Sequence, residues 1–278
     1  MSQTATNFLK VKEFNEVFGH PAPSSAQKTI FESHPTVVKL RNNLINEEFS
    51  ELLESFEDKD LVEIVDALSD ILYVAYGLLV VYGVDGDEQF KLNLQAKVDA
   101  QNYAGDEEIS LNPKATTNFQ LTRDFCSIFF GDLILGAENC KPCTFFSDED
   151  SRRLTVFNTF LLDFENELNH LAEATETSDF ERVISITSNI TYITYVLGLI
   201  FGVDLDVGVD LVHKSNMSKL CVSEGEAKET VAWYEANERR YDTPNYRQNS
   251  KGYVIFNEST GKILKNINYK PVDLSSLV

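Results

Sequence analysis

Residues 44–73 constrain the fold of this chain more than any other stretch, because apolar and acidic side chains recur there together at helical spacing. Apolar residues repeat with this period over 44–56 and again over 61–75, and the sequence Glu-Asp-Lys-Asp at 57–60 separates the two runs. The second run is apolar almost all round, which leaves little room for a solvated face. We therefore predict two packed helices, of which the second is buried in a helical bundle.

Six carboxylates lie on this pair of helices: Glu47, Glu48, Glu51, Glu63, Asp66 and Asp70. Residues three or four apart share one face of a helix, so each helix groups three of them. Between Asn42 and Gln89 the only basic residue is Lys59, and carboxylates held together out of water repel one another unless a cation lies among them. Hard cations such as Mg²⁺ bind oxygen ligands. The pattern predicts a metal site, and the alternative is an acidic face in contact with water.

The same carboxylates carry a resemblance to a known superfamily. Glu47-Glu48-x-x-Glu51, followed by Glu63-x-x-Asp66 and by the sequence DALSDILYVAYG at 66–77, resembles the signature of the all-α nucleoside triphosphate pyrophosphohydrolases, which include MazG, dimeric dUTPases and phosphoribosyl-ATP pyrophosphohydrolase. The resemblance implies an all-α fold and a metal-activated water that attacks the triphosphate, so that pyrophosphate and a nucleoside monophosphate are released. These residues do not fix the preferred base or sugar.

The resemblance also implies a role for each carboxylate. The expected ligands of Mg²⁺, with Mn²⁺ as the alternative ion, are Glu48, Glu51, Glu63 and Asp66. Glu47 is either a further ligand or the catalytic general base. Asp70 lies one turn along the same stripe and is expected to orient a ligand or a metal-bound water. The number of metal ions stays open.

The chain contains two copies of one helical unit. Thr6-Asn7-Phe8 matches Thr117-Asn118-Phe119, and the sequence YGVD at 82–85 matches FGVD at 201–204, at an offset that grows only where loops are expected. We predict a MazG-like first unit over 1–105, a linker over 106–114, a second unit over 115–222, and a C-terminal helix with a small basic β-hairpin over 223–278. The expected architecture is an all-α pseudo-dimer within one chain, and its further association stays open.

The two copies differ where the chemistry is expected. Glu47, Glu48, Glu51, Glu63, Asp66 and Asp70 correspond in that order to Asp163, Phe164, Glu167, Arg182, Ser185 and Asn189. Only the first copy therefore keeps the metal ligands. The second copy continues instead as VHKSNMSKL at 212–220, a basic and amide-bearing segment that the first copy lacks. We predict that each copy supplies half of one active site.

Five residues are expected to contact the substrate: Lys214, Asn216, Lys219, Lys262 and Lys265. Lys214 and Lys219 are candidates for the phosphates and Asn216 for the base or the sugar. The alternative for the two lysines is that they complement the dipole of a helix end. Lys262 and Lys265 are candidates to close over the phosphates from the tail, and the alternative is a solvated hairpin.

The charge and hydropathy of the chain exclude some classes of binding partner. A net charge of −20 argues against a nucleic-acid-binding surface, since such surfaces neutralise phosphates with Lys and Arg. The N-terminus lacks the apolar core of a secretory signal, and the apolar stretches 71–84 and 190–203 are short for membrane spans. We expect a cytoplasmic protein with a small-molecule nucleotide as its ligand and with no nucleic-acid or membrane partner.

Other functions fit parts of the sequence. A non-catalytic nucleotide-binding or interaction protein with a retained metal site is the main alternative. Glu167-x-x-His170 has the spacing used in di-iron bundles, but the remaining histidines supply no second pair. Cys140-Lys-Pro-Cys143 has thioredoxin-like spacing without a surrounding βαβ pattern, so its role stays open. His20 is expected to be an exposed loop residue.

Overall fold

The computed structural model describes residues 5–104, 109–131, 142–147 and 152–278. Its α-helices are α1 (Asn7–Phe18), α2 (Ile30–Ser33), α3 (Pro35–Asp58), α4 (Leu61–Tyr82), α5 (Gly86–Ala104), α6 (Asn118–Phe130), α8 (Arg152–Glu176), α9 (Phe180–Phe201), α10 (Leu205–Met217) and α11 (Glu224–Asn237). The remaining elements are the 3-10 helices η1 (Pro142–Thr144) and η2 (Ser275–Leu277) and the strands β1 (Pro244–Gln248) and β2 (Tyr253–Asn257). The all-α prediction with a C-terminal hairpin is confirmed.

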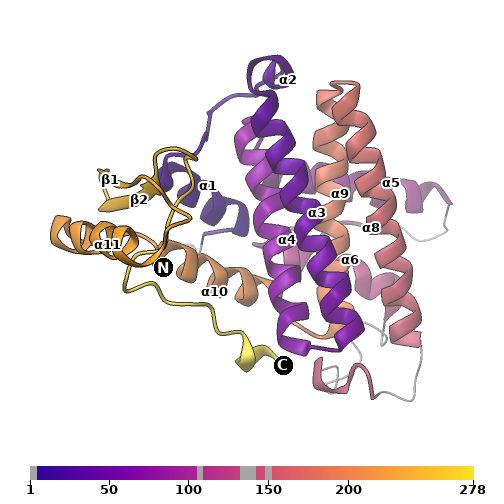
Figure 1. Cartoon of the computed structure of the whole chain (residues 1–278). Helices are drawn as coiled ribbons and strands as arrows, with labels where there is room; N and C mark the ends of the chain where they lie inside the picture. Colours follow the sequence, from indigo (N-terminus) through magenta and orange to yellow (C-terminus); the bar gives the residue numbers. More distant parts are fainter. Residues whose placement is uncertain (1–4, 105–108, 132–141, 148–151) are drawn as a thin grey trace.

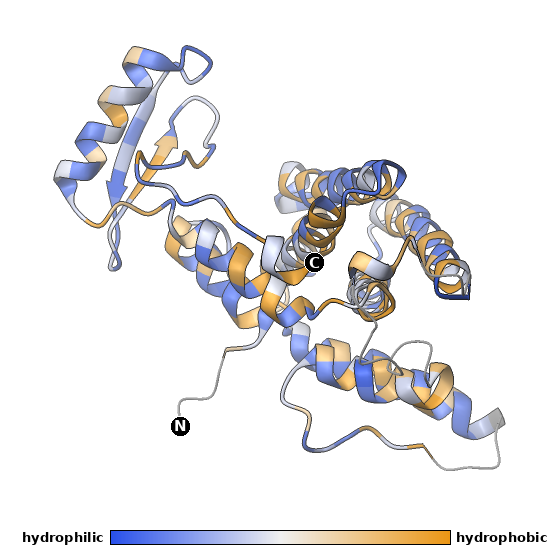
Figure 2. Cartoon of the chain, turned by 90° about the horizontal axis from the view of Figure 1, so that it is seen from below, coloured by the Kyte–Doolittle hydropathy of each residue, from blue (hydrophilic) through white to orange (hydrophobic). Residues whose placement is uncertain are grey.

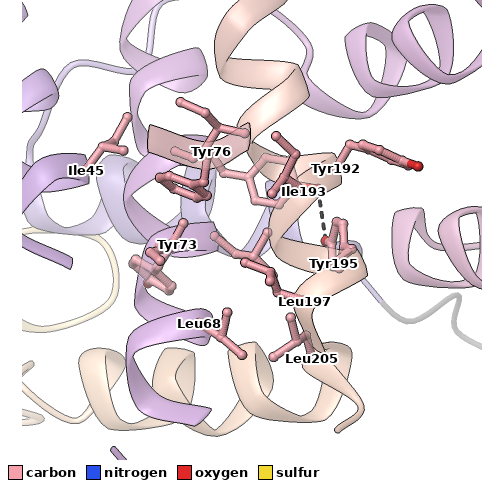
Figure 3. Packing of buried hydrophobic residues seen from close by; sticks show 14 of the residues in the cluster. Ile45, Leu68, Tyr73, Tyr76, Tyr192, Ile193, Tyr195, Leu197 and Leu205 are labelled. Atoms are coloured by element: carbon pink, nitrogen blue, oxygen red, sulfur yellow. Dashed lines mark hydrogen bonds between the residues drawn. The ribbon is translucent and has the colours of Figure 1, made fainter. Parts of the chain in front are cut away.

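The centre of the fold is a bundle of the four long helices α3, α4, α8 and α9 (Figure 1). α3 pairs with α4, α8 pairs with α9, and the two apolar helices α4 and α9 pack against each other. Figure 3 shows their side chains meeting in the interior, among them Tyr76 and Tyr195. This core arises because α4 and α9 are apolar nearly all round and must be covered on every side.

The ends of the two central helices are set by the same sequence devices. Asp60 caps α4 by accepting hydrogen bonds from the backbone N–H groups of Val62 and Glu63, and Asp179 caps α9. Gly83 and Gly202 end these helices with φ of 70° and 94°, a conformation that glycine adopts without strain. The break predicted at 57–60 is shorter in the structure, because Glu57 and Asp58 still belong to α3 and only Lys59 and Asp60 separate it from α4.

The elements of the two halves follow in the same order. α1, α3, α4 and α5 are matched by α6, α8, α9 and α10, and Thr6 and Thr117 cap the first helix of each half with their side chains. The hydrophobic core includes residues from both halves. This order is the one expected from the two-copy interpretation, which stays a prediction, as do the domain boundaries. Residues 105–108 of the expected linker lie outside the described residues.

The tail forms a small lobe beside the bundle (Figure 2). Here α11 packs on an antiparallel hairpin in which Pro244 pairs with Asn257 and Gln248 with Tyr253. The C-terminal helix predicted within 223–278 is α11. The alternating residues 251–265 supply only the second strand of the hairpin, because its first strand is the polar segment 244–248. On its other side β2 makes the isolated bridges Tyr253 to Cys221 and Phe256 to Ile263.

Two helices of the described chain, Leu61–Tyr82 and Phe180–Phe201, are long and apolar enough to cross a membrane. They are longer than the stretches expected from the sequence, but most of each is buried inside the fold, at 83% and 89% of the apolar window. Such burial is what the core helices of a soluble protein show.

Candidate active site

A cavity of about 450 Å³ opens between the α3–α4 pair and the crossing helices α1 and α10. The tail closes one side of it with Lys265, Tyr269 and Val272. The first half thus supplies α1, α3 and α4, whereas α10 and the tail come from more than a hundred residues further along the chain. The cavity combines acidic, basic and aromatic side chains.

The acidic side of the cavity consists of Glu48 on α3 and of Asp66 and Asp70 on α4. Burial, followed by the charges of the nearby Glu51, Asp66 and Glu47, raises the pKa of Glu48 to about 7. Burial, followed by the charge of Glu63, raises the pKa of Asp66 to about 6. The pKa of Asp70 is also raised well above its ordinary value, mainly by burial and then by Asp66. The raised pKa values show that burial and mutual repulsion make the ionised carboxylates unfavourable in this site.

The other three predicted carboxylates lie at the rim. Glu47, Glu51 and Glu63 are exposed and do not line the cavity, yet their charges act on Glu48 or Asp66. Within the described ranges, no group of three His, Cys, Asp or Glu side chains is already arranged to hold a metal ion. In the structure Glu48, Asp66 and Asp70 therefore line the cavity, whereas Glu47, Glu51 and Glu63 lie at its rim.

The six carboxylates are the kind of ligand that a hard divalent cation binds. All six side chains offer oxygen ligands, and Asp66 has a buried Oδ1 atom with no hydrogen-bond partner. A buried acceptor without a donor is costly, and a cation would satisfy it. A metal held by Glu48 and Asp66 would require Glu51 and Glu63 to turn inward from the rim.

Three of the five residues expected to contact substrate line the cavity: Asn216, Lys219 and Lys265. Lys219 donates a hydrogen bond to Asn216 Oδ1 at 2.6 Å, and its Nζ lies 5.8 Å from the ring centre of Phe14. Burial lowers the pKa of Lys219 to about 8, and the charge of Lys265 acts in the same direction. Lys219 is therefore a desolvated cation facing the cavity.

Lys214 and Lys262 are placed outside the cavity lining. Lys214 forms an ion pair of 2.6 Å with Asp210 one turn earlier on α10. Lys262 lies over the ring of Tyr241 at 5.8 Å. Helical periodicity explains the first case, because Lys214 does not share the face of α10 on which Val212 and Ser215 line the cavity.

A hydrogen-bonded chain leads from the cavity wall to the surface. The hydroxyl of Tyr73 hydrogen-bonds His213 Nδ1 at 3.1 Å and also Asn216. His213 Nε2 lies 3.4 Å from Glu13, which forms an ion pair with Lys251. Burial lowers the pKa of His213 although Glu13 opposes this, so a neutral ring that donates from Nε2 fits both contacts.

Arg41 and Asn15 line the cavity although the sequence analysis did not single them out, and His20, which was expected to be exposed, lines it as well. His20 is half-buried rather than exposed, it stacks on Phe14 with a ring separation of 5.8 Å, and burial lowers its pKa to about 4. Arg41 lies one residue before the segment in which basic residues were sought. Its spacing of two helical turns from Glu48 was the signal that could have found it.

Comparison with known proteins places these features in a family. The family model for phosphoribosyl-ATP pyrophosphohydrolase (PRA-PH) matches residues 11–96, which include α3, α4 and all six carboxylates. The uncharacterized protein L479 of Acanthamoeba polyphaga mimivirus is 31% identical over 290 residues, which cover 100% of this chain and 97% of that protein.

The chain belongs to the all-α nucleoside triphosphate pyrophosphohydrolase superfamily.

No solved structure matched this chain. The superfamily match supports a pyrophosphohydrolase type of activity and a nucleotide as the ligand. It ends before the second half begins, so that α6 to α11 lie outside the matched segment. The basic side of the cavity, from α10 and the tail, is thus read from the structure of this chain.

The second half has different side chains where the first half has its six carboxylates. Asn189 Nδ2 donates to Glu167 Oε1 at 2.7 Å, and Lys97 Nζ lies 4.7 Å from the ring centre of Tyr192. Burial lowers the pKa of Lys97, whereas the charges of Glu167 and Asp163 act to raise it. An amide and an ammonium group therefore accompany the remaining acids. His170, which is exposed, lies 3.7 Å from the half-buried Glu167, with no second such pair in the described chain.

Cys143 is exposed and is a free thiol, and Cys140 lies outside the described residues.

Proposed function

We propose that this protein is a Mg²⁺-dependent nucleoside triphosphate pyrophosphohydrolase that converts a ribo- or deoxyribonucleoside triphosphate into the monophosphate and pyrophosphate. The observation that carries the proposal is one cavity lined by acids and by two lysines, of which Lys219 is desolvated by burial and Lys265 is exposed at the opening. Glu48, Asp66 and Asp70 face Lys219 and Lys265 across a space large enough for a small-molecule ligand. A triphosphate bound through divalent cations would complement both sides.

The chemistry of the acidic side supports a metal. Glu48 and Asp66 would hold Mg²⁺, or Mn²⁺, together with Glu51 and Glu63 from the rim. Such an ion, when bound, neutralises phosphate charge and lowers the pKa of a bound water. Its positive charge would also relieve the repulsion that raises the pKa values of Glu48 and Asp66.

The remaining residues bind, orient and move a proton. Lys219 and Lys265 would contact the phosphates, and the hydrogen bond from Lys219 to Asn216 fixes the ammonium group on the cavity side of α10. Glu47 is exposed beside Glu48, so it is free to accept a proton from the attacking water or to serve as a further ligand. Asp70 lies deeper in the cavity wall and would orient its neighbours.

Two further features belong to the proposal. The matched order and caps of the two halves support an intrachain pseudo-dimer, in which the second half supplies α10 and not a second metal site. The acidic composition and the burial of the two apolar helices support a cytoplasmic protein without nucleic-acid or membrane partners.

The test is pyrophosphate release from a panel of ribo- and deoxyribonucleoside triphosphates, with and without Mg²⁺. Activity should require the metal and should disappear in Glu51→Gln and Asp66→Asn. The matched control is Glu167→Gln, which changes the second-half counterpart of Glu51 and should leave turnover intact. Retained activity in both first-half variants would refute the ligand assignment.

The alternative is a nucleotide-binding protein that does not catalyse hydrolysis. The polar, partly preformed cavity favours binding under either interpretation. Mg²⁺-dependent binding of a non-hydrolysable triphosphate analogue, without pyrophosphate release from any member of the panel, would support this alternative.

A further inference from the structure

Arg41 lies in the cavity wall and has no hydrogen-bond or ion-pair partner among the residues that the structure describes. Its Nε atom is buried and donates to no acceptor, and no acidic side chain in the described part of the chain lies within ion-pair distance. Burial lowers its pKa to about 10, so the guanidinium remains charged at neutral pH. A buried cation without acceptors is costly unless a ligand supplies them.

Arg153 shows how this chain buries an arginine for structural purposes. The Arg153 guanidinium donates to the carbonyl oxygen of Ile200 at 2.9 and 3.2 Å and to that of Phe201 at 3.2 Å. These bonds tie α8 to the end of α9. Arg41 makes no comparable bond, and it faces a cavity instead of a helix end.

The backbone of α4 makes room for the Arg41 side chain. A Cβ atom at Gly77 would lie 2.6 Å from Arg41 Nη1, closer than van der Waals contact allows. Glycine inside a helix is unfavourable relative to alanine. The glycine therefore permits a guanidinium to lie against α4 at this level of the bundle.

The floor of the cavity has three zones along the α3–α4 pair. Arg41 lies at one end, Leu44 and Val74 form an apolar middle, and Glu48 and Asp70 lie at the other end. Seven residues separate Arg41 from Glu48, which is about 10 Å along a helix. The distance suits a sugar and a base between the phosphates and the guanidinium.

We propose that Arg41 binds the base of the nucleotide and that the preferred base carries a carbonyl oxygen on the edge that faces it. This inference rests on the proposed function, because that function places the phosphates at the acidic end. An apolar middle zone does not solvate a phosphate chain, whereas a sugar and a flat base pack against Leu44, Val74 and the neighbouring Phe14.

The chemistry of the guanidinium selects the base. Arginine offers donors only, arranged as a planar fork, and a carbonyl oxygen accepts two N–H groups while a ring nitrogen accepts one. Guanine and uracil carry such an oxygen and adenine does not. His20 and Phe14 lie beside this end, and the neutral His20 ring adds no second positive charge.

Steady-state kinetics with GTP, UTP, ATP and inorganic tripolyphosphate tests the inference. The variants are Arg41→Met, which removes the guanidinium, Arg41→Lys, which keeps a charge without the fork, and Gly77→Ala, which displaces the guanidinium without replacing it. Arg182→Met is the matched control, because Arg182 is exposed and pairs with Glu173 in the second half. Thermal unfolding of each variant shows whether it is folded.

The expected result is a rise of about tenfold or more in KM for GTP or UTP in Arg41→Met, since a hydrogen bond to a charged group is lost. Arg41→Lys should recover part of the loss, Gly77→Ala should reproduce much of it, and kcat should change little. ATP and tripolyphosphate should respond weakly. An equal loss on tripolyphosphate would place Arg41 at the phosphates and overturn the inference, as would wild-type preference for ATP.

Binding of GMP, UMP and AMP in the absence of divalent metal separates this inference from the proposed function. If the wild type hydrolyses nothing, the proposed function fails. A selective loss of GMP or UMP binding in Arg41→Met and Gly77→Ala would still support base recognition by Arg41. Unchanged monophosphate binding in both folded variants would refute it even when hydrolysis is confirmed.

Discussion

The hydroxyl oxygens of Tyr76 and Tyr195 lie 2.9 Å apart at the buried centre of the molecule (Figure 3). Asn7 donates to the Tyr195 hydroxyl at 3.1 Å, and Asn118 donates to the Tyr76 hydroxyl at 2.9 Å. The first helix of each half thus reaches the central helix of the other half. The same two amides also donate to Asp206 and Asp87, so the network is reciprocal.

Removing one of these hydroxyls should destabilise the protein. Tyr76→Phe and Tyr195→Phe each leave a buried donor or acceptor unpaired, and we expect each to lower the free energy of unfolding by about 1–2 kcal/mol. Because the two hydroxyls share one network, the double variant should lose less than the sum of the single losses. Urea unfolding of the four proteins measures this coupling.

Tyr103→Phe is the control for this experiment, since Tyr103 is 96% exposed. The two-copy interpretation adds that Tyr76→Phe and Tyr195→Phe have similar effects. Additive losses, or a loss confined to one tyrosine, would mean that the network is not shared between the halves.

The buried rings of Phe49 and Phe164 pack together, and substitutions of Phe164 should destabilise the protein. Their rings stack with centres 4.4 Å apart and planes 3° from parallel, joining α3 to α8. Phe164 occupies the position at which the first half has Glu48. We expect Phe164→Ala to cost about 3–5 kcal/mol through the cavity it leaves, and Phe164→Glu to cost more because a carboxylate would be buried against Phe49.

Urea unfolding measures both Phe164 variants, with Leu162→Ala on the exposed face of the same helix as the control. A mild effect of Phe164→Glu would show that the second half tolerates a carboxylate there. In that case packing would not explain why the second half lacks one.

The Tyr73 hydroxyl should support substrate binding through Asn216. Tyr73→Phe removes its bonds to His213 and Asn216, and loss of one such bond corresponds to about 1 kcal/mol, or roughly a fivefold lower kcat/KM. Steady-state hydrolysis measures the change. Tyr192→Phe, at the matching position of the second half, should leave kcat/KM unchanged, and equal losses in the two variants would contradict a role specific to the first-half cavity.

Helical periodicity and capping residues were sufficient to predict much of this structure from the sequence. Helical periodicity and the Asp60 cap fix the α3–α4 pair, and residues spaced by three or four bring Glu48, Asp66 and Asp70 to one surface. Which side of that surface is a cavity depends on α1 and α10, whose approach is set by distant contacts such as the ion pair of Lys10 with Asp210 at 3.2 Å.

The same reason explains the residues that sequence analysis missed or misplaced. Arg41 and His20 face the cavity only because α10 and the tail cover them, and no local pattern encodes that cover. Lys214 looked equivalent to Lys219 in the sequence, but Asp210 one turn away pairs with it. The first strand of the hairpin has little apolar alternation and is held mainly by pairing with β2.

The metal-free protein should lose stability as the pH rises through the site. The folded state holds the pKa of Glu48 at about 7 and that of Asp66 at about 6, against ordinary values of 4.5 and 3.8. Between the two sets of values the folded state keeps protons that the unfolded state has released, so the free energy of unfolding falls as pH rises. After allowance for solvent screening and coupling, we expect these carboxylates to contribute a loss of about 2 kcal/mol.

Urea unfolding at pH 5 and pH 8 in the presence of a chelator measures this loss, and Glu48→Gln and Asp66→Asn should reduce it. Glu165→Gln, at an exposed position of α8, is the control. Mg²⁺ should stabilise the protein more at pH 8 than at pH 5, because it binds the ionised carboxylates. His20, whose pKa is lowered by burial, acts in the opposite direction, so the comparison of wild type with each variant isolates the carboxylates. An unchanged pH dependence in both carboxylate variants would mean that these two acids are not strained in the folded state.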